Sequence, residues 1–284
     1  MNIIKLQGGL GNQLFQYVFA LYLKKKLNTH VKFDLAADLV AQYSAGKLDL
    51  QKLGINPEIA SVEEIRSFKK LPINLWRVER KICHLLPSFN KKNYVQNNAQ
   101  AEVPLADNIY YDGYFQKYFF VDEVINQLRN QISTDEKLLA KNSSFLAEVE
   151  KTRATAIHIR RGDYIAVKAN RKIFQICDMD YYTKAIDYIK SKTDTKKFFI
   201  FTQDKDWAKE NFIGDQFEIF EGKSAIEDLL MMSRCYHNII GNSTFSWWAA
   251  TLNPNADKIV VAPKKWYKDE RDLTDFIGIE WIRI

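Results

Sequence analysis

The second half of the chain alternates short apolar runs with amphipathic runs, and this pattern constrains the fold more than any other feature of the sequence. Strand-like segments rich in Ile, Val and Phe recur from residue 155 onward, with helical spacing between them. Such alternation predicts a parallel, doubly wound α/β sheet. The expected strands are 155–159, 198–201, 217–220, 238–240 and 258–261, and the expected helices are 181–189, 206–212, 225–235 and 245–252.

The first half begins with a strand, a glycine-rich loop and a helix, which is the opening of another α/β domain. The chain has 284 residues, and single hydrophobic cores usually stop growing at about 250 to 300 residues. Two domains are therefore expected, 1–150 and 151–284. The elements expected in the first are strands 3–6 and 31–35, helical segments up to Leu27, over 61–86 and over 121–149, and a polar surface loop over 87–107.

Composition and charge exclude several classes of protein. The chain is 46% hydrophobic and carries a net charge of +6, which suits a small anion, an acidic membrane surface or nucleic acid about equally. Its three cysteines are far apart and lack C-x-x-C spacing, so neither a disulfide framework nor a zinc knuckle is expected, and a cytosolic location fits. The apolar run 14–23 is too short to span a bilayer, and lysines follow it rather than precede it as in a signal peptide.

The glycine loop Gly8-Gly9-Leu10-Gly11-Asn12-Gln13 lies between the first strand and the first helix. Backbone N–H groups and the helix dipole can hold a phosphate or another anion at such a place. The loop is not a dinucleotide fingerprint, because Leu14 stands where that motif requires glycine, and it lacks the Gly-Lys-Ser/Thr of a Walker A loop. A tight turn without a ligand is the alternative interpretation.

Two consecutive arginines, Arg160 and Arg161, follow the first strand of the second half, where open α/β sheets bind their ligands. Neighbours on a strand point to opposite faces, so one guanidinium can reach the ligand while the other is buried or paired with a carboxylate. Arg160 is in phase with His158 and is the one expected at the ligand. A guanidinium fits a pyrophosphate and can neutralise the charge on a departing nucleoside diphosphate. A structural arginine cluster is the alternative, and the Arg-Gly-Asp tripeptide at 161–163 is attributed to chance.

A second anion seat is predicted where the strand 238–240 runs into an apolar helix. Three hydroxyl side chains and one amide stand at the start of this helix, although Ser243 or Thr244 could simply cap it. Trp247 and Trp248 are expected in the core. Asp228, on a neighbouring helix, could reach the same crevice, and taken alone it would be a surface carboxylate.

Two Asp-x-Asp sequences, Asp178-Met179-Asp180 and Asp204-Lys205-Asp206, have the form by which many glycosyltransferases hold a divalent metal. Each stands directly before an expected helix, so capping of the helix is the preferred explanation. The chain also lacks G-x-S-x-G and H-E-x-x-H, and its four histidines form no ligand cluster. Hydrolysis by a catalytic triad or by zinc is therefore not expected.

Four motifs, at 8–16, 158–164, 201–204 and 241–249, together resemble the bacterial α-1,2-fucosyltransferases of glycosyltransferase family 11. They occur in the family's order between residue 8 and about residue 253, and residues 55–105 carry little of the resemblance. The resemblance implies a GT-B architecture of two Rossmann-like domains facing a cleft, GDP-β-L-fucose as donor, no metal, and inversion to an α-1,2-fucosylated glycan. Mammalian members carry a membrane anchor, which this sequence does not show.

The resemblance also implies roles for individual residues. Arg160 corresponds to the arginine that holds the donor diphosphate, His158 lies near the nucleoside or phosphate, and Asp228 reads the guanine. The remaining donor-binding set comprises Gly9, Gly11, Asn12 and Gln13 on one side of the cleft, and Asp204, Asn242, Ser243, Thr244 and Ser246 on the other.

The general base is left open by the sequence. Glycosyl transfer passes through an oxocarbenium-like transition state, and a base would help to remove the proton of the acceptor hydroxyl. Asp163, Asp178 and Asp180 are all candidates, and spacing favours none of them. Asp163 is taken with Arg160 as the catalytic pair, although Asp163 could instead pair with an arginine, and no base is needed if departure of GDP leads the reaction.

The expected activity is a metal-independent transfer of fucose to the 2-hydroxyl of a terminal galactose in a surface polysaccharide. Acceptor preference is expected to reside in the first domain and the loop 87–107. The alternatives are a glycosyltransferase with another nucleotide sugar or linkage, and a non-catalytic protein that binds a glycan or an anion. Nucleic-acid binding is not expected, because the basic residues do not cluster with interleaved aromatic residues. The positive charge suits peripheral contact with the inner membrane, and the sequence indicates no oligomeric state.

Overall fold

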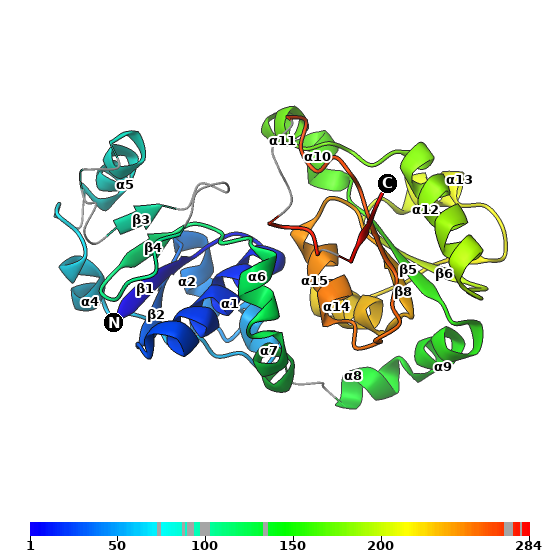
Figure 1. Ribbon diagram of the computed structural model, residues 1–284, viewed down its shortest axis with the longest axis horizontal. Coiled ribbons are helices and arrows are strands. Elements are labelled where there is room, and N and C mark those ends of the chain that lie inside the picture. The colour runs from blue at the N-terminus through cyan, green and yellow to red at the C-terminus, as the bar shows by residue number, and fades with distance from the viewer. Residues whose placement is uncertain are drawn as a thin grey trace. The chain divides into compact units, whose positions relative to one another are not determined.

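The computed structural model describes residues 1–72, 75–86, 89, 94–96, 103–132, 136–269, 275–278 and 280–284, apart from the side chains of His84, Gln96 and Asp163. The chain divides into two compact units, Met1–Ser133 and Thr134–Ile284 (Figure 1). This division comes before the expected boundary at residue 150. The helices that precede residue 150 belong to the second unit, because Phe145 packs on Phe199 and Phe220 with ring centroids 4.6 and 4.7 Å apart.

The first unit contains a four-stranded parallel sheet in the order β2-β1-β4-β3. Its third strand in the chain was not expected, since it falls within the polar stretch 87–107. Tyr94 in that strand pairs with Tyr110, and the two rings stack with centroids 5.6 Å apart. Tertiary pairing therefore overrides a polar local sequence. The strands are β1 (Asn2–Leu6), β2 (Val31–Leu35), β3 (Tyr94–Gln96) and β4 (Tyr110–Asp112).

The long helix α1 packs its apolar side into the core of the first unit. Its Phe19 stacks on Phe115 with ring centroids 4.1 Å apart, and the helix ends at Asn28 in the left-handed conformation. The expected helical stretches 61–86 and 121–149 are each divided into shorter helices. The helices of this unit are α1 (Leu10–Leu27), α2 (Ala37–Ser44), α3 (Asp49–Lys52), α4 (Val62–Ser67), α5 (Trp76–Leu85), α6 (Tyr118–Asp122) and α7 (Ile125–Gln131).

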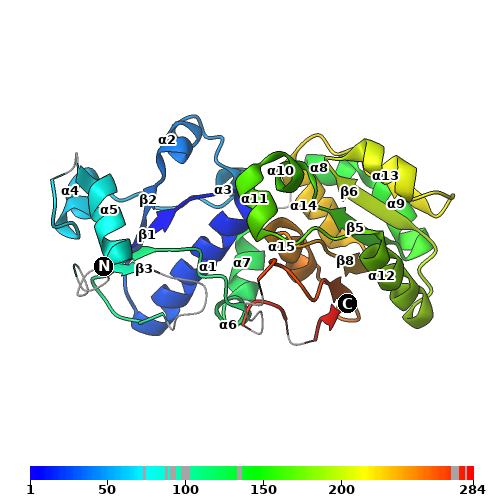
Figure 2. The same ribbon diagram turned by 90° about the horizontal axis from the view of Figure 1, so that it is seen from above.

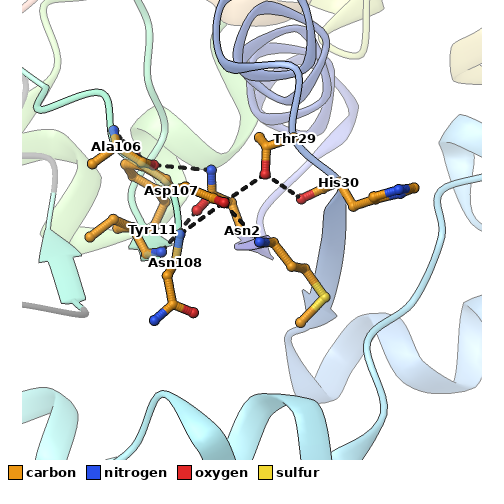
Figure 3. Close-up of polar contacts among 9 residues, drawn as sticks. Asn2, Thr29, His30, Ala106, Asp107, Asn108 and Tyr111 are labelled. Atoms are coloured by element: carbon orange, nitrogen blue, oxygen red, sulfur yellow. Dashed lines mark hydrogen bonds and ion pairs between the residues drawn. The ribbon is translucent and has the colours of Figure 1, made fainter.

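Polar side chains join the amino ends of strands in the first unit (Figure 3). The Asp107 carboxylate accepts hydrogen bonds from the chain's amino terminus at 2.8 Å and from the Thr29 hydroxyl at 2.6 Å. These two bonds, together with one from the Asn108 backbone, lower the pKa of Asp107 to about 2. The Asn2 side chain spans the same edge, donating to the Ala106 carbonyl. Charge and hydrogen bonds therefore hold this edge together, beside the apolar packing of Met1 on the cluster that contains Ile3.

The second unit contains a six-stranded sheet in the order β10-β9-β8-β5-β6-β7, parallel throughout. Numbered along the unit, this is the strand order 3-2-1-4-5-6 of the doubly wound dinucleotide-binding fold. The expected parallel sheet is confirmed, and the final strand β10 was not expected. The strands are β5 (Thr155–Ile159), β6 (Phe198–Thr202), β7 (Phe217–Ile219), β8 (His237–Ile239), β9 (Val260–Ala262) and β10 (Ile282–Arg283).

Helices cover both faces of this sheet (Figure 2). On one face, Tyr182 and Ile189 of α12 pack with Ile157 of β5. On the other face, the strand residue Phe199 meets α9. The buried pair Trp247 and Trp248 lies in the core, as expected. The helices are α8 (Glu136–Lys141), α9 (Ser143–Thr152), α10 (Gly162–Ala166), α11 (Lys168–Ile173), α12 (Met179–Lys192), α13 (Lys205–Asn211), α14 (Ala225–Arg234) and α15 (Thr244–Leu252).

The α-helices in the described part of the chain are between 4 and 18 residues long. None of its helices combines the length and apolar character that crossing a bilayer requires.

Candidate functional site

The strand order of the second unit reverses between β5 and β8, and open α/β sheets bind ligands outside the carboxyl ends of the strands at such a switch point. Gly241, which follows β8, lies against the end of β5. A Cβ atom at this position would lie 3.1 Å from the His158 carbonyl oxygen and 3.5 Å from the Arg160 nitrogen. The absence of a side chain at Gly241 therefore lets the two predicted motifs approach each other.

Two tyrosines of α12 hold this edge of the sheet in place. The Tyr182 hydroxyl donates to the His158 carbonyl at 3.2 Å, and the Tyr181 hydroxyl donates to the Ile240 carbonyl at 2.6 Å. Both tyrosines are buried. They are positioning residues that sequence reasoning missed, because their spacing only indicated the start of a helix.

The two consecutive arginines have different surroundings. Arg161 donates from Nε to Asp204 at 3.1 Å, and its guanidinium lies 4.3 Å from the ring centroid of Trp207. It is thus the arginine that pairs with a carboxylate. The half-buried Arg160 lies with its guanidinium carbon 5.4 Å from the ring centroid of Tyr164, close enough to His158 for its charge to affect that imidazole.

His158 is a neutral imidazole at physiological pH. Burial, and then the charge of Arg160, lower the pKa of His158 to about 3, and the side chain is only 6% exposed. Its ring lies 5.7 Å from that of Phe245 in the first turn of α15. Among the described residues, no partner is found for its Nδ1 atom. A buried nitrogen of this kind is stabilised when a ligand or water supplies the missing hydrogen bond.

The hydroxyl groups at the start of α15 divide into two kinds. Ser243 caps the helix by accepting from the Phe245 nitrogen at 3.3 Å, and the fully buried Ser246 donates within the turn to the Gly241 carbonyl. The half-buried Thr244 hydroxyl forms no hydrogen bond to the residues that the structure describes. Of the three predicted phosphate contacts, Thr244 is therefore the hydroxyl still available to a ligand, beside the helix amino terminus.

The Asn242 side chain points into the protein. Its amide nitrogen donates to the carbonyl oxygens of Gln175 and of Trp266, the latter at 3.1 Å, and the residue is fully buried. Asn242 thus ties two distant segments to the switch point. The geometry assigns it a positioning role rather than the direct donor contact that was expected.

Adjacent carboxylates on α14 behave oppositely. Glu227 is buried and accepts hydrogen bonds from Lys141 at 2.7 Å, from Asn142 at 2.9 Å and from the Lys223 backbone at 2.8 Å. Burial alone would raise the pKa of Glu227, but these bonds outweigh it and the pKa is lowered. Asp228 has no hydrogen bond within the described residues, and burial followed by the charge of Glu227 raises its pKa to about 6.

Gly222 makes room for the Asp228 carboxylate. A Cβ atom at Gly222 would lie 1.8 Å from Oδ1 of Asp228, so any side chain there would displace the carboxylate. Sequence reasoning missed this residue. The available signal was a glycine two positions before the Ser224 cap of α14, which accepts from the Glu227 nitrogen at 3.1 Å.

The first aspartate of each Asp-x-Asp sequence caps a helix, which confirms the explanation preferred from the sequence. Asp178 accepts from the Tyr181 nitrogen at 3.0 Å, and the exposed Asp180 pairs with Lys184 at 2.6 Å. Asp204 accepts from the Trp207 nitrogen at 3.4 Å besides pairing with Arg161, so both of its oxygens already have protein partners. Across the described residues, no group of three or more potential metal ligands is found. The side chain of Asp163, the expected catalytic carboxylate, lies outside the described structure.

Two side chains of the glycine loop form hydrogen bonds within the first unit. Gln13 donates to the Gly8 carbonyl at 2.8 Å, and Asn12 accepts from Gln116 at 2.9 Å. Gly9, the residue before α1, is exposed, and Gly11 is buried within the first turn. These four predicted donor residues lie in the first unit, whereas the others lie in the second, and their role in donor binding stays a prediction.

Comparisons with known proteins agree with this architecture. The family model described as Glycosyl transferase family 11 matches residues 1–284. The O-antigen biosynthesis glycosyltransferase WbnK of Escherichia coli is 31% identical over 288 residues, covering 92% of this chain and 93% of that protein. An alpha-1,2-colitosyltransferase of Escherichia coli is 29% identical, covering 99% and 98%. The human galactoside alpha-(1,2)-fucosyltransferase 1 is 24% identical, covering 86% of this chain and 63% of that protein.

A solved structure shares the fold. The fucosyltransferase NodZ from Bradyrhizobium superposes with a TM-score of 0.51 over 90% of this chain and 96% of that chain, at 13% sequence identity. At that identity the likeness shows the fold alone. Two α/β units with parallel sheets are the GT-B architecture that the motifs implied. The match of the family model over the whole chain establishes that this protein is a glycosyltransferase and belongs to glycosyl transferase family 11.

Proposed function

We propose that this protein transfers L-fucose from GDP-β-L-fucose to the 2-hydroxyl of a terminal galactose, with inversion at the sugar carbon. Family membership and a relative named as a galactoside alpha-(1,2)-fucosyltransferase support the reaction class. The observation that carries the proposal is the switch point of the second unit, where Arg160 follows β5, Gly241 lies against the Arg160 backbone, and Thr244 begins α15 three residues later.

The donor diphosphate is assigned to this switch point. Arg160 supplies a guanidinium that can bond two phosphate oxygens, and Thr244 supplies a hydroxyl beside the backbone N–H groups of α15. His158 contributes an uncharged ring nitrogen, so the positive charge at this site comes from Arg160 and the helix amino terminus. None of these groups is negatively charged, so together they suit the binding of a diphosphate.

The guanine base is assigned to Asp228. Guanine presents two adjacent N–H donors, and an ionised carboxylate can accept both of them. Asp228 is suited to this role because its carboxylate has no hydrogen bond to any residue that the structure describes and lies in the space that Gly222 leaves open. Uracil lacks this pair of donors, so GDP is expected to bind more tightly than UDP.

Transfer is proposed as a single displacement. The acceptor oxygen forms its bond to the sugar C1 as the bond from C1 to the β-phosphate oxygen breaks, and the electron pair of that bond leaves with GDP. Arg160 and the α15 amino terminus stabilise the charge that develops on the leaving group. The acceptor proton passes to a base, for which Asp163 is the candidate, because Asp178 caps a helix and Asp180 is paired with Lys184.

A second donor is favoured by one comparison. One relative, 29% identical over nearly the full length of both chains, is named an alpha-1,2-colitosyltransferase. Colitose is a deoxy analogue of fucose, and the residues assigned above contact only the nucleotide part of such a donor. Transfer of colitose in the same linkage is therefore the alternative activity.

The test is a calorimetric titration with GDP and with UDP in EDTA, followed by product analysis with GDP-fucose and GDP-colitose on a galactose-terminated acceptor. Saturable GDP binding, weaker UDP binding and a 1,2-linked fucosyl product are expected. GDP binding that appears only after Mg²⁺ or Mn²⁺ is restored would contradict a diphosphate site built on Arg160. Colitosyl product alone would select the alternative donor, and tight GDP binding without either product would indicate another donor sugar or another acceptor.

A further inference from the structure

The short helices α10 and α11 present aliphatic side chains to solvent. Ile165, Val167 and Ile173 are 37%, 46% and 44% exposed. Exposed aliphatic residues scattered singly are ordinary, but these three lie within nine residues of one another, on two helices that contact each other and on the residue that joins them (Figures 1 and 2). With the cations between them, Lys168, Arg171 and Lys172, they form what we call the α10–α11 surface.

This surface is strongly basic. The stretch 164–177 contains no Asp or Glu. The segment that contains Lys268 lies beside it, since the Lys268 nitrogen donates to the Ile173 carbonyl at 2.8 Å, and it adds three exposed lysines with Asp269 as its one carboxylate among residues 264–269. None of the six cations has an ion-pair partner in the described part of the chain. They are Lys168, Arg171, Lys172, Lys264, Lys265 and Lys268.

The surface is held rigidly on the second unit. Tyr164 of α10 stacks on Phe174, which follows α11, with ring centroids 4.3 Å apart and an angle of 9° between the rings. Phe174 also forms a bridge to Tyr267. The backbone that carries the aliphatic and cationic groups is therefore held in place by these aromatic contacts.

We propose that the α10–α11 surface docks this protein on an anionic lipid membrane. Aliphatic side chains flanked by Lys and Arg are the pattern by which interfacial segments enter the boundary between headgroups and acyl chains. Nucleic acid would favour cations with aromatic stacking platforms, which Ile165, Val167 and Ile173 do not supply. The inference rests on the charge and exposure of this surface, so it does not depend on the identity of the donor sugar.

Vesicle sedimentation with the full chain tests the proposal. The wild type is expected to bind vesicles of equimolar phosphatidylcholine and phosphatidylglycerol, and not vesicles of phosphatidylcholine alone. The variant Lys168→Gln/Arg171→Gln/Lys172→Gln should bind on the order of a hundredfold more weakly, because each cation near an anionic surface contributes roughly a fivefold factor.

A matched variant removes the same charge elsewhere. Lys47→Gln/Lys196→Gln/Lys209→Gln changes exposed lysines outside the surface and should bind the mixed vesicles as the wild type does. Equal loss in both triple variants would overturn the proposal, since it would reduce membrane binding to net charge. Unchanged binding by the α10–α11 triple variant would overturn it as well.

The aliphatic contribution is separated by salt. High salt screens the cations, so any remaining binding should depend on apolar contact and be lost in Ile165→Ser/Ile173→Ser. GDP affinity and transfer to a soluble acceptor should stay at wild-type values in both surface variants, which keeps this test distinct from that of the proposed function. Loss of soluble transfer, or a selective loss of DNA binding with vesicle binding retained, would assign the surface to substrate or to nucleic acid instead.

Discussion

Two acidic residues, Asp112 at the end of a strand in the first unit and Asp228 on a helix of the second, have contrasting surroundings. In the first unit, Asp112 ends β4 and is buried with four donors on its two oxygens: Nε of Arg80 at 2.7 Å, the Tyr94 hydroxyl at 2.6 Å, and the side chains of Gln7 and Arg80 at 3.2 and 3.1 Å. In the second unit, Asp228 has no hydrogen bond to a described residue. The fold supplies the hydrogen bonds of the Asp112 carboxylate, whereas the Asp228 carboxylate is left for a ligand.

The difference shows how structural and functional polar groups can be told apart. A buried polar network whose members satisfy one another stabilises a unique packing, whereas a half-buried group without a partner costs free energy in the absence of a ligand. Arg161 with Asp204 repeats the first pattern within the second unit, beside Arg160. Substitution separates the two classes: a group of the completed class, whose hydrogen bonds the fold supplies, affects stability, and a group of the open class, which is left for a ligand, affects donor binding or turnover.

The largest effect is expected at Arg160. Replacing it with alanine should lower kcat/KM by about two to three orders of magnitude, since one preorganised charged donor to a leaving group contributes that much. The unfolding transition should stay close to that of the wild type. Steady-state kinetics and circular dichroism measure the two, and turnover near the wild-type value would remove Arg160 from the reaction.

Asp112→Asn should act on stability and not on the donor. It leaves the Arg80 guanidinium and the Tyr94 hydroxyl without a charged acceptor, and because Arg80 is 43% exposed the loss is expected near the low end for broken ion pairs, about 2 kcal/mol. Urea unfolding measures the free energy, with the exposed Asp215→Asn as the control. A weakened GDP affinity with unchanged stability would place Asp112 in the open class.

Asp228→Asn should weaken GDP binding by about ten- to a hundredfold at pH 7.5, because a hydrogen bond to a charged group contributes roughly 1.5–3 kcal/mol. The pKa of Asp228 is about 6, so its share of the affinity is complete well above pH 6 and is lost as the pH falls through 6. The phosphate of GDP also gains a proton in this pH range. The difference in GDP affinity between wild type and variant cancels that effect and isolates Asp228. A constant difference from pH 5 to pH 8 would argue against guanine recognition by the ionised carboxylate.

The same substitution has an opposite effect on stability. The folded state raises the pKa of Asp228 above its unfolded value, so the ionised carboxylate destabilises the fold at high pH and ceases to do so once it is protonated. Asp228→Asn should therefore be more stable than the wild type at pH 8, with the advantage shrinking as the pH falls through 6. Equal stability of the variant and the wild type both at pH 8 and below pH 6 would show that the ionised Asp228 carboxylate does not destabilise the fold.

Gly222→Ala should weaken GDP binding by no more than Asp228→Asn does, because the added Cβ acts only by displacing that carboxylate. Combining the two substitutions should add little to the loss, since both remove one interaction. Calorimetry on the two single variants and the double variant gives the coupling. Additive losses would mean that Gly222 contacts the donor in its own right.

The smallest effect is expected at Asp180. Asp180→Asn removes an exposed pair with Lys184, which contributes about 0.3–0.5 kcal/mol, and kcat/KM should change by less than about twofold, with or without EDTA. A large loss of kcat/KM that added Mg²⁺ or Mn²⁺ restores would indicate that a metal held by Asp178 and Asp180 stabilises the leaving group.

Local patterns of the sequence predicted much of this protein correctly. The alternation after residue 155 predicted the parallel sheet of the second unit, and the capping roles of Asp178 and Asp204 followed from their places before helices. The motif around Arg160 and Arg161 was placed at the end of a strand, with one arginine paired to a carboxylate. These features depend on residues close in the chain, whose periodicity and capping are visible in the sequence.

Tertiary structure decided the rest. Nothing in the spacing of Glu227 and Asp228 distinguishes them, yet Lys141 and Asn142 complete the first while Gly222 leaves room for the second. In the same way, β3 and the early boundary between the units follow from stacking and packing partners far away in the chain. The sequence determines which residues form strands, helices and caps because those depend on chain neighbours; burial and contacts between distant residues decide which polar groups are completed and which stay open for a ligand.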